Sequence, residues 1–186
     1  MPTVKEGWRG RFYEDFAVGD LFRCRYGRTI TEYDNISFSL LSNNSNQVHF
    51  NDDYARRTEW GRCLVNSLLT LAVVTGMSTE DVSENGFALG WQGIELPHPV
   101  FAGDTLYSES EVLSNRESKS RPTQGIIEVE TRGFNQNAVL VLRFRRTVMV
   151  WKRDHAPSVD LPTLLRPTES TGPVGSGRPG GDEGRR

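Results

Sequence analysis

The sequence has little of what secreted, membrane-bound or cofactor-dependent proteins require. Its 186 residues contain two cysteines, Cys24 and Cys63, which are too few for a disulfide framework. Both have apolar neighbours, which favours buried free thiols in a reducing compartment. No apolar run approaches the roughly 20 residues that span a bilayer, and the first fifteen residues lack the apolar core of a signal peptide. We therefore expect a soluble, cytoplasmic protein without a membrane partner.

Charge, histidine content and glycine spacing argue against a protein that binds nucleic acid, a metal ion or a nucleotide cofactor. A formal net charge of -2 and a pI near 6.0 give no indication of a nucleic-acid partner. The three histidines lack paired ligand spacing, so we expect no metal site. No glycine-rich phosphate motif follows a predicted strand, so we expect no nucleotide cofactor.

Composition divides the chain into three segments. Residues 1–11 form an N-terminal extension, and residues 12–152 are long enough for one well-buried domain. Residues 153–186 are dominated by Pro, Gly, Ser, Thr and charged side chains. Such a segment cannot bury enough apolar area to offset its ordering entropy, so we expect a flexible tail.

The hydrophobic pattern predicts one strand and two helices in the first half of the domain. Residues 21–30 alternate as a strand does, and Thr31 with Asp34 predicts a capped helix over residues 32–42. The apolar residues of this helix should form one face; they are Ile36, Phe38, Leu40 and Leu41. Residues 64–77 are apolar nearly all round, which predicts a helix that a curved sheet encloses.

The second half of the domain is predicted to be almost entirely strand. The four expected strands cover residues 87–96, 105–113, 126–134 and 139–151, and residues 135–137 have the composition of a hairpin turn. The order of elements predicts an α+β fold with a bent antiparallel sheet around a central helix. We expect two such sheets to join edge to edge in a homodimer, or in a higher homo-oligomer built from dimers, because open edges promote aggregation.

The segment from Asn44 to Ala55 is the strongest candidate for a site. It places His49 five residues after a polar amide and shortly before the predicted apolar helix. A lone imidazole beside the start of a buried helix has the layout of a site that moves protons next to a polarised carbonyl. From the residues alone, an ordinary loop or cap histidine is an equally good interpretation.

Two motifs in this sequence resemble those of the MaoC-like hydratases, the (R)-specific enoyl-CoA hydratase family with the hotdog fold. The family's motif of Asp, spacer, Asn-Pro, aliphatic residue, His and downstream Ala occurs here as Asn44, Ser45, Asn46-Gln47, Val48, His49 and Ala55. The family's Leu-Pro-x-Phe-x-Gly-Asp turn occurs with a small insertion from Leu96 to Asp104. The resemblance covers about residues 12–151 and implies an enzyme that acts on acyl-CoA without a further cofactor.

The resemblance also implies roles for individual residues. The general acid/base of the family falls on His49, and its oxyanion donor falls on the backbone N–H of Ser67, with Asn66 before it. A hydroxyl further along the helix falls on Thr70 or Thr75. Hydration of an enoyl thioester drives negative charge onto the thioester oxygen, and the first N–H groups of a helix are free to stabilise it.

One position departs from the family, because Asn44 stands where the family has its catalytic aspartate, and an amide cannot exchange a proton near neutral pH. Three accounts remain open. His49 acts alone while Asn44 orients the water; or another carboxylate has taken over, the candidates being Asp52, Asp53, Glu95 and Asp104; or the site binds acyl-CoA without chemistry, as the partner of a second subunit. The amide variant resembles hydratases of branched C5 dicarboxylic acyl-CoAs such as mesaconyl-CoA or itaconyl-CoA.

Further residues are expected to bind substrate. They are Asn46, Asn66, Trp60, Thr70, Thr75, Arg116 and Arg121. The two arginines could hold CoA phosphates or a carboxylate, or could simply face water at a hairpin end. Trp60 could wall an acyl tunnel or serve the core. The predicted activity is reversible hydration of a 2-enoyl-CoA, with a thioesterase or a non-catalytic acyl-CoA-binding subunit as alternatives.

Overall fold

The computed structural model describes residues 3, 5 and 7–158. All of the described helices and strands belong to one compact unit, residues 1–156. Most of the predicted tail, from residue 159 on, lies outside the described residues, and the predicted domain boundaries stay predictions. No helix in the described part of the chain is long and apolar enough to cross a membrane.

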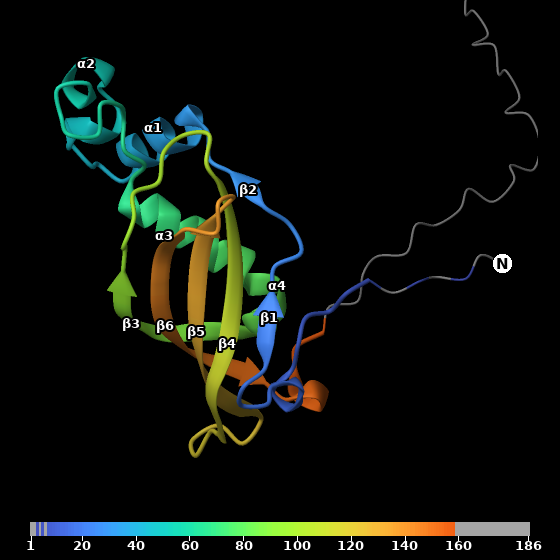
Figure 1. Cartoon of the computed structure of the whole chain (residues 1–186). Coiled ribbons are helices and arrows are strands. Elements are labelled where there is room, and N and C mark those ends of the chain that lie inside the picture. Colours follow the sequence, from blue (N-terminus) through green and yellow to red (C-terminus); the bar gives the residue numbers. More distant parts are fainter. Residues whose placement is uncertain (1–2, 4, 6, 159–186) are drawn as a thin grey trace, which may run out of the picture. The chain divides into compact units, whose positions relative to one another are not determined.

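A six-stranded antiparallel sheet curves around one helix, α3, as Figure 1 shows. The elements in chain order are η1 (Tyr13–Asp15), β1 (Leu21–Arg23), β2 (Arg28–Thr29), α1 (Glu32–Leu41), η2 (Gln47–His49), α2 (Asp52–Ala55), α3 (Ser67–Met77), α4 (Thr79–Val82), β3 (Gly86–Glu95), β4 (Thr105–Glu117), β5 (Gln124–Asn135), β6 (Leu140–Trp151) and η3 (Arg153–His155). The sheet order is β1-β4-β5-β6-β3, and β2 also pairs with β4. The predicted α+β fold is therefore confirmed, although the strand expected over residues 21–30 is interrupted into β1 and β2.

Helix α1 begins as predicted but buries a partly different face. Thr31 and Asp34 make both hydrogen bonds of a capping box. The buried residues of α1 are the polar Asn35 and Ser39, while Ile36, Leu40 and Leu41 are exposed. The predicted apolar face is therefore only partly present: Phe38 packs against the core, whereas the fully buried side chains of α1 are polar and are held by hydrogen bonds.

Helix α3 packs on the concave face of the sheet along one side only. Gly133 of β5 permits this contact, since a Cβ at that position would lie 2.7 Å from Cγ2 of Val74. The opposite side of α3 is open in the single chain, with Leu68 57% exposed. The prediction of a helix enclosed all round is thus correct for one face and wrong for the other.

The concave face of the sheet carries two apolar clusters with polar residues between them. Along β6, Phe144 belongs to one cluster and Val148 to the other. Arg146 stands between them, because alternate residues of a strand share a face. Strands β4 and β5 also carry buried polar residues between apolar ones. Together these residues form a row across the three strands; they are Ser108, Ser110, Thr131 and Arg146. We call these four residues the polar layer.

Candidate active site

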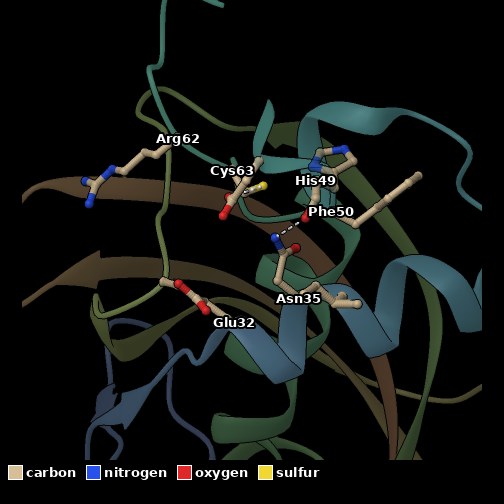
Figure 2. Close-up of a pocket in the computed structure, with 9 residues that line it drawn as sticks. Glu32, Asn35, His49, Phe50, Arg62 and Cys63 are labelled. Carbon is tan, nitrogen blue, oxygen red and sulfur yellow. Dashed lines mark hydrogen bonds between the residues drawn. The ribbon is translucent and has the colours of Figure 1, made fainter. Parts of the chain in front are cut away.

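The side chain of Asn35 in α1 holds together the histidine segment and the start of α3. Its amide nitrogen donates to the carbonyl oxygens of His49 at 2.7 Å and Leu64 at 3.1 Å. Its amide oxygen accepts from the backbone N–H of Asn66 at 2.8 Å. Figure 2 shows the bond to His49. One buried amide therefore fixes the backbone on both sides of the candidate site.

The ring of His49 is fixed in one tautomer. Its Nδ1 lies 2.8 Å from the carbonyl oxygen of Leu64. A carbonyl can only accept, so Nδ1 carries the proton and the neutral ring keeps a lone pair on Nε2. The residue is 7% exposed and lines a cavity. His49 is thus a buried and oriented imidazole and not a solvated loop histidine.

The cavity beside His49 has a volume of about 250 Å³ and two carboxylates in its lining. Glu32, at the start of α1, was not predicted (Figure 2). Asp52 was one of the four candidate carboxylates. The other three lie elsewhere, where Asp53 pairs with Arg57, Glu95 pairs with Arg143 and Asp104 accepts from the backbone N–H of Phe101. Of the four, only Asp52 shares the cavity with the imidazole.

Cys63 and Arg62 complete the polar part of this lining. Arg62 lies over the ring of Phe101 at 3.8 Å. Cys63 donates from its thiol to Asp52 at 3.3 Å. Both cysteines are free thiols, and both are half-buried where burial was predicted. Burial, and then the hydrogen bond to Asp52, raise the pKa of Cys63 to about 11.

We expect Cys63 to be a slow nucleophile near neutral pH. Its thiolate fraction at pH 8 lies far below that of an ordinary cysteine, whose pKa is about 8.5. Alkylation by iodoacetamide in a Cys24→Ser background should therefore run at least tenfold slower than that of a cysteine peptide, and should accelerate as the pH approaches 11. Because the folded state holds this proton more tightly than the unfolded chain, ionisation at high pH should also weaken the fold. Rapid labelling at pH 8 would contradict the assignment.

Asn44 and Asn46 serve the turn before His49. The amide oxygen of Asn44 accepts from the backbone N–H of Asn46 at 3.0 Å, and that of Asn46 accepts from Val48 at 3.2 Å. In the part of the chain that the structure describes, neither lines the cavity of His49. Asn44 is thus near His49 in the sequence, but its amide oxygen accepts a hydrogen bond within its own turn.

The amino end of α3 forms a second candidate site. Asn66 caps the helix, with its amide oxygen accepting from Leu68 at 3.0 Å. The backbone N–H of Ser67 has no acceptor among residues 7–158. Ser67 lines a cavity of about 200 Å³ together with Trp60, Thr70 and His98. The structure thus brings together three of the predicted residues around a free helix N–H group.

The two cavities are lined by adjacent stretches of backbone. Cys63 lines the cavity of His49, whereas Leu64 and Val65 line that of Ser67. Leu64 itself pairs with Phe101 in an isolated bridge. In the single chain, the imidazole and the helix N–H group therefore belong to neighbouring cavities and not to one.

The remaining predicted residues lie apart from His49. Thr75 lines an apolar cavity beside Leu68 and Trp91. Arg116 and Arg121 lie at the β4–β5 turn, at the end of the sheet opposite to α1 (Figure 1). There Arg121 lies 5.7 Å from the ring of Phe87. In one chain these two arginines cannot share a ligand with the imidazole.

A bent antiparallel sheet around one helix, with a buried imidazole near the amino end of that helix, defines a hotdog-fold protein of the MaoC-like class. The family model described as mesaconyl-CoA hydratase matches residues 3–161. The chain belongs to this family.

Curated relatives agree with this assignment. The chain is 34% identical over 156 residues to a mesaconyl-CoA hydratase of Cereibacter sphaeroides, covering 83% of this chain and 45% of the relative. It is 34% identical over 171 residues to a beta-methylmalyl-CoA dehydratase of Chloroflexus aurantiacus, covering 88% and 48%. The chain thus spans about half the length of these relatives.

Solved structures confirm the predicted hotdog fold. A putative MaoC domain protein dehydratase from Chloroflexus aurantiacus superposes with a TM-score of 0.77 at 32% identity, covering 87% of this chain and 47% of that one. A Mycobacterium tuberculosis protein with a double hotdog fold superposes with a TM-score of 0.71 at 23% identity, covering 80% and 47%. This chain corresponds to about half of each.

Proposed function

We propose that the protein is a hydratase that adds water reversibly to the double bond of a short, branched, dicarboxylic 2-enoyl-CoA of the mesaconyl-CoA type. The observation that carries the proposal is the buried, tautomer-fixed ring of His49 in a cavity beside the free amino end of α3. The names of the curated relatives support both the reaction and the acyl class.

The reaction needs a base, an acid and a stabilised oxyanion. Nε2 of His49 removes a proton from water as the oxygen attacks the β-carbon, and the N–H of Ser67 stabilises the charge on the thioester oxygen. Nε2 of His49 then delivers that proton to the α-carbon, so that the ring serves in turn as base and acid and is neutral again at the end of the reaction. A helix N–H group placed on this oxygen contributes about 3 kcal/mol, a factor of on the order of a hundred in rate.

The missing aspartate is compensated by another carboxylate in this proposal. Asp52 and Glu32 line the cavity of His49, whereas the amide oxygen of Asn44 is engaged by Asn46. We assign the supporting role to Asp52, which lines the cavity and accepts a hydrogen bond from the thiol of Cys63. Asn44 keeps the turn that carries His49 and needs no proton for that task.

The complete site is proposed to form in a dimer. The open face of α3 and the edge strand β3 expose apolar side chains that one chain leaves uncovered; they are Leu68, Phe87, Leu89 and Trp91. A second copy paired along β3 would cover them and would close the cavities that line α3. Light scattering of the purified chain should give twice the mass of the chain, and a monomeric mass would contradict this arrangement.

The experiment that tests the function follows the ultraviolet absorbance of the enoyl thioester for mesaconyl-CoA, itaconyl-CoA and crotonyl-CoA. Loss of absorbance without release of free thiol is the expected result. Release of thiol would instead identify the thioesterase alternative, which the high pKa of Cys63 already disfavours as an acyl-cysteine enzyme. Binding of the thioesters without turnover would leave the non-catalytic subunit.

A further inference from the structure

Within the described part of the chain, Arg146 in β6 is a buried cation that has no anionic partner. It is 3% exposed, and its only hydrogen bond among residues 7–158 runs from Nη2 to the hydroxyl of Ser78 at 2.9 Å. Its Nε has no partner in the described part of the chain. Burial lowers the pKa of this guanidinium to about 10, with no charge nearby to offset it.

The other arginines of β5 and β6 are paired, Arg145 with Glu130 at 3.6 Å. Arg132 contacts Glu109 and Glu111, and Arg143 contacts Glu95 at 2.6 Å. A buried charge is costly unless it is paired and hydrogen-bonded. The carboxyl end of α3 near Ser78 offers at most a partial negative charge, equivalent to roughly half an elementary charge. Arg146 therefore has an unmet requirement for an anion that this end of the helix does not supply.

Arg146 is next to two residues that belong to, or contact, the lining of the apolar cavity along α3. Its cross-strand neighbour Trp91 lines that cavity, as does Thr75. Ser78 connects the two sides, because its hydroxyl accepts from Arg146 and donates to the carbonyl oxygen of Thr75 at 2.7 Å. The hydroxyl of Thr75 is itself buried without a partner among the described residues. Of these two polar groups that lack a partner among the described residues, the hydroxyl of Thr75 belongs to a residue that lines this cavity of about 370 Å³, whereas Arg146 does not line it and is connected to it through Ser78 and Trp91.

We propose that Arg146, with Thr75, binds the free carboxylate of the acyl group, and so determines specificity for dicarboxylic substrates. This inference rests on the proposed function, with the thioester at the amino end of α3. Thr75 follows Ser67 by eight residues, which is about 12 Å at the rise of an α-helix.

This spacing suits a short chain with an anionic end. Hydrogen bonds of about 2.9 Å at each end leave roughly 6 Å, and a four-carbon acyl chain with its terminal oxygen spans roughly 5 Å at ordinary bond lengths. A neutral chain would leave the buried guanidinium unpaired, and discrimination against it follows from that cost.

The test compares binding of two unreactive thioesters, methylsuccinyl-CoA and butyryl-CoA, by calorimetry. Wild-type protein should bind methylsuccinyl-CoA more tightly than butyryl-CoA. Arg146→Met should raise the Kd for methylsuccinyl-CoA by about 100-fold and leave that for butyryl-CoA unchanged. Arg143→Met, on the same strand but paired with Glu95, should leave both Kd values unchanged.

Two outcomes would overturn the proposal. They are a wild-type protein without preference between the thioesters, and an Arg146→Met protein that loses both equally. If the protein still hydrates crotonyl-CoA in either case, the hydratase function stands and only the role of Arg146 fails; if nothing binds or reacts, both fall. If Arg146→Met does not fold, Thr75→Val is the second test. It should raise the Kd for methylsuccinyl-CoA by about fivefold and leave that for butyryl-CoA unchanged. A Thr75→Val protein with both Kd values unchanged would contradict the proposal.

Discussion

Replacement of His49 by alanine is expected to lower kcat/KM for hydration by about 10³-fold, the size of effect that general acid–base catalysis supports. The fold should survive, because the carbonyl oxygen of Leu64 that the ring contacts also accepts from the side chain of Asn35. The measurement is the rate of absorbance loss, with circular dichroism and the melting temperature as checks on folding.

His155 provides a control for this substitution. It is exposed in η3 and lines neither the cavity of His49 nor that of Ser67. His155→Ala should therefore change kcat/KM by less than about threefold. Hydration by His49→Ala at the wild-type rate would remove the imidazole from the mechanism.

Replacement of Asn35 by alanine is expected to lower the free energy of unfolding by about 3 kcal/mol. The substitution leaves the N–H of Asn66 without its acceptor and removes a donor from two buried carbonyl groups, and each such loss costs about 1–3 kcal/mol before relaxation. Urea denaturation with a common m-value measures the change. Activity should fall as well, because the same side chain sets the spacing between His49 and α3.

Asn35→Asp distinguishes the loss of hydrogen bonds from the loss of side-chain volume as the cause of a lower free energy of unfolding. It keeps the shape and the acceptor but loses the donor to the carbonyl groups of His49 and Leu64, so the loss should be comparable to that for alanine. Asn44→Ala, which removes one bond in an exposed turn, should cost less than about 1 kcal/mol. Equal effects of Asn35→Ala and Asn44→Ala would show that Asn35 is not the tether we describe.

Local signals in the sequence predicted most of the elements. The Thr31–Asp34 capping box and the alternating strands β3 to β6 are short-range features, and the structure contains them. The buried polar face of α1 was missed, because burial of Asn35 and Ser39 depends on partners 14 to 31 residues away. The spacing of these two polar residues by one helical turn is the signal that could have indicated this face.

The candidate site was less accessible to sequence reasoning than the fold. The family motif identified His49 and Ser67, and the tautomer of the ring depends on the carbonyl of Leu64, fifteen residues away. Glu32 enters the cavity from α1, and no pattern near His49 indicates it. The role that we propose for Asp52 likewise depends on tertiary contacts, because only the fold shows which carboxylates share a cavity with His49.

The polar layer separates the apolar residues on the concave face of the sheet into two clusters. Residues of one cluster can therefore be substituted with little effect on the other. Apolar residues near the candidate site, such as Phe144, share no cluster with those at the far end, such as Val148. Substitutions that reshape the first region should therefore be nearly additive with substitutions in the second. Because of this division, substitutions in the cluster beside the candidate site can change which ligand fits there. The other cluster can meanwhile keep the strands in register.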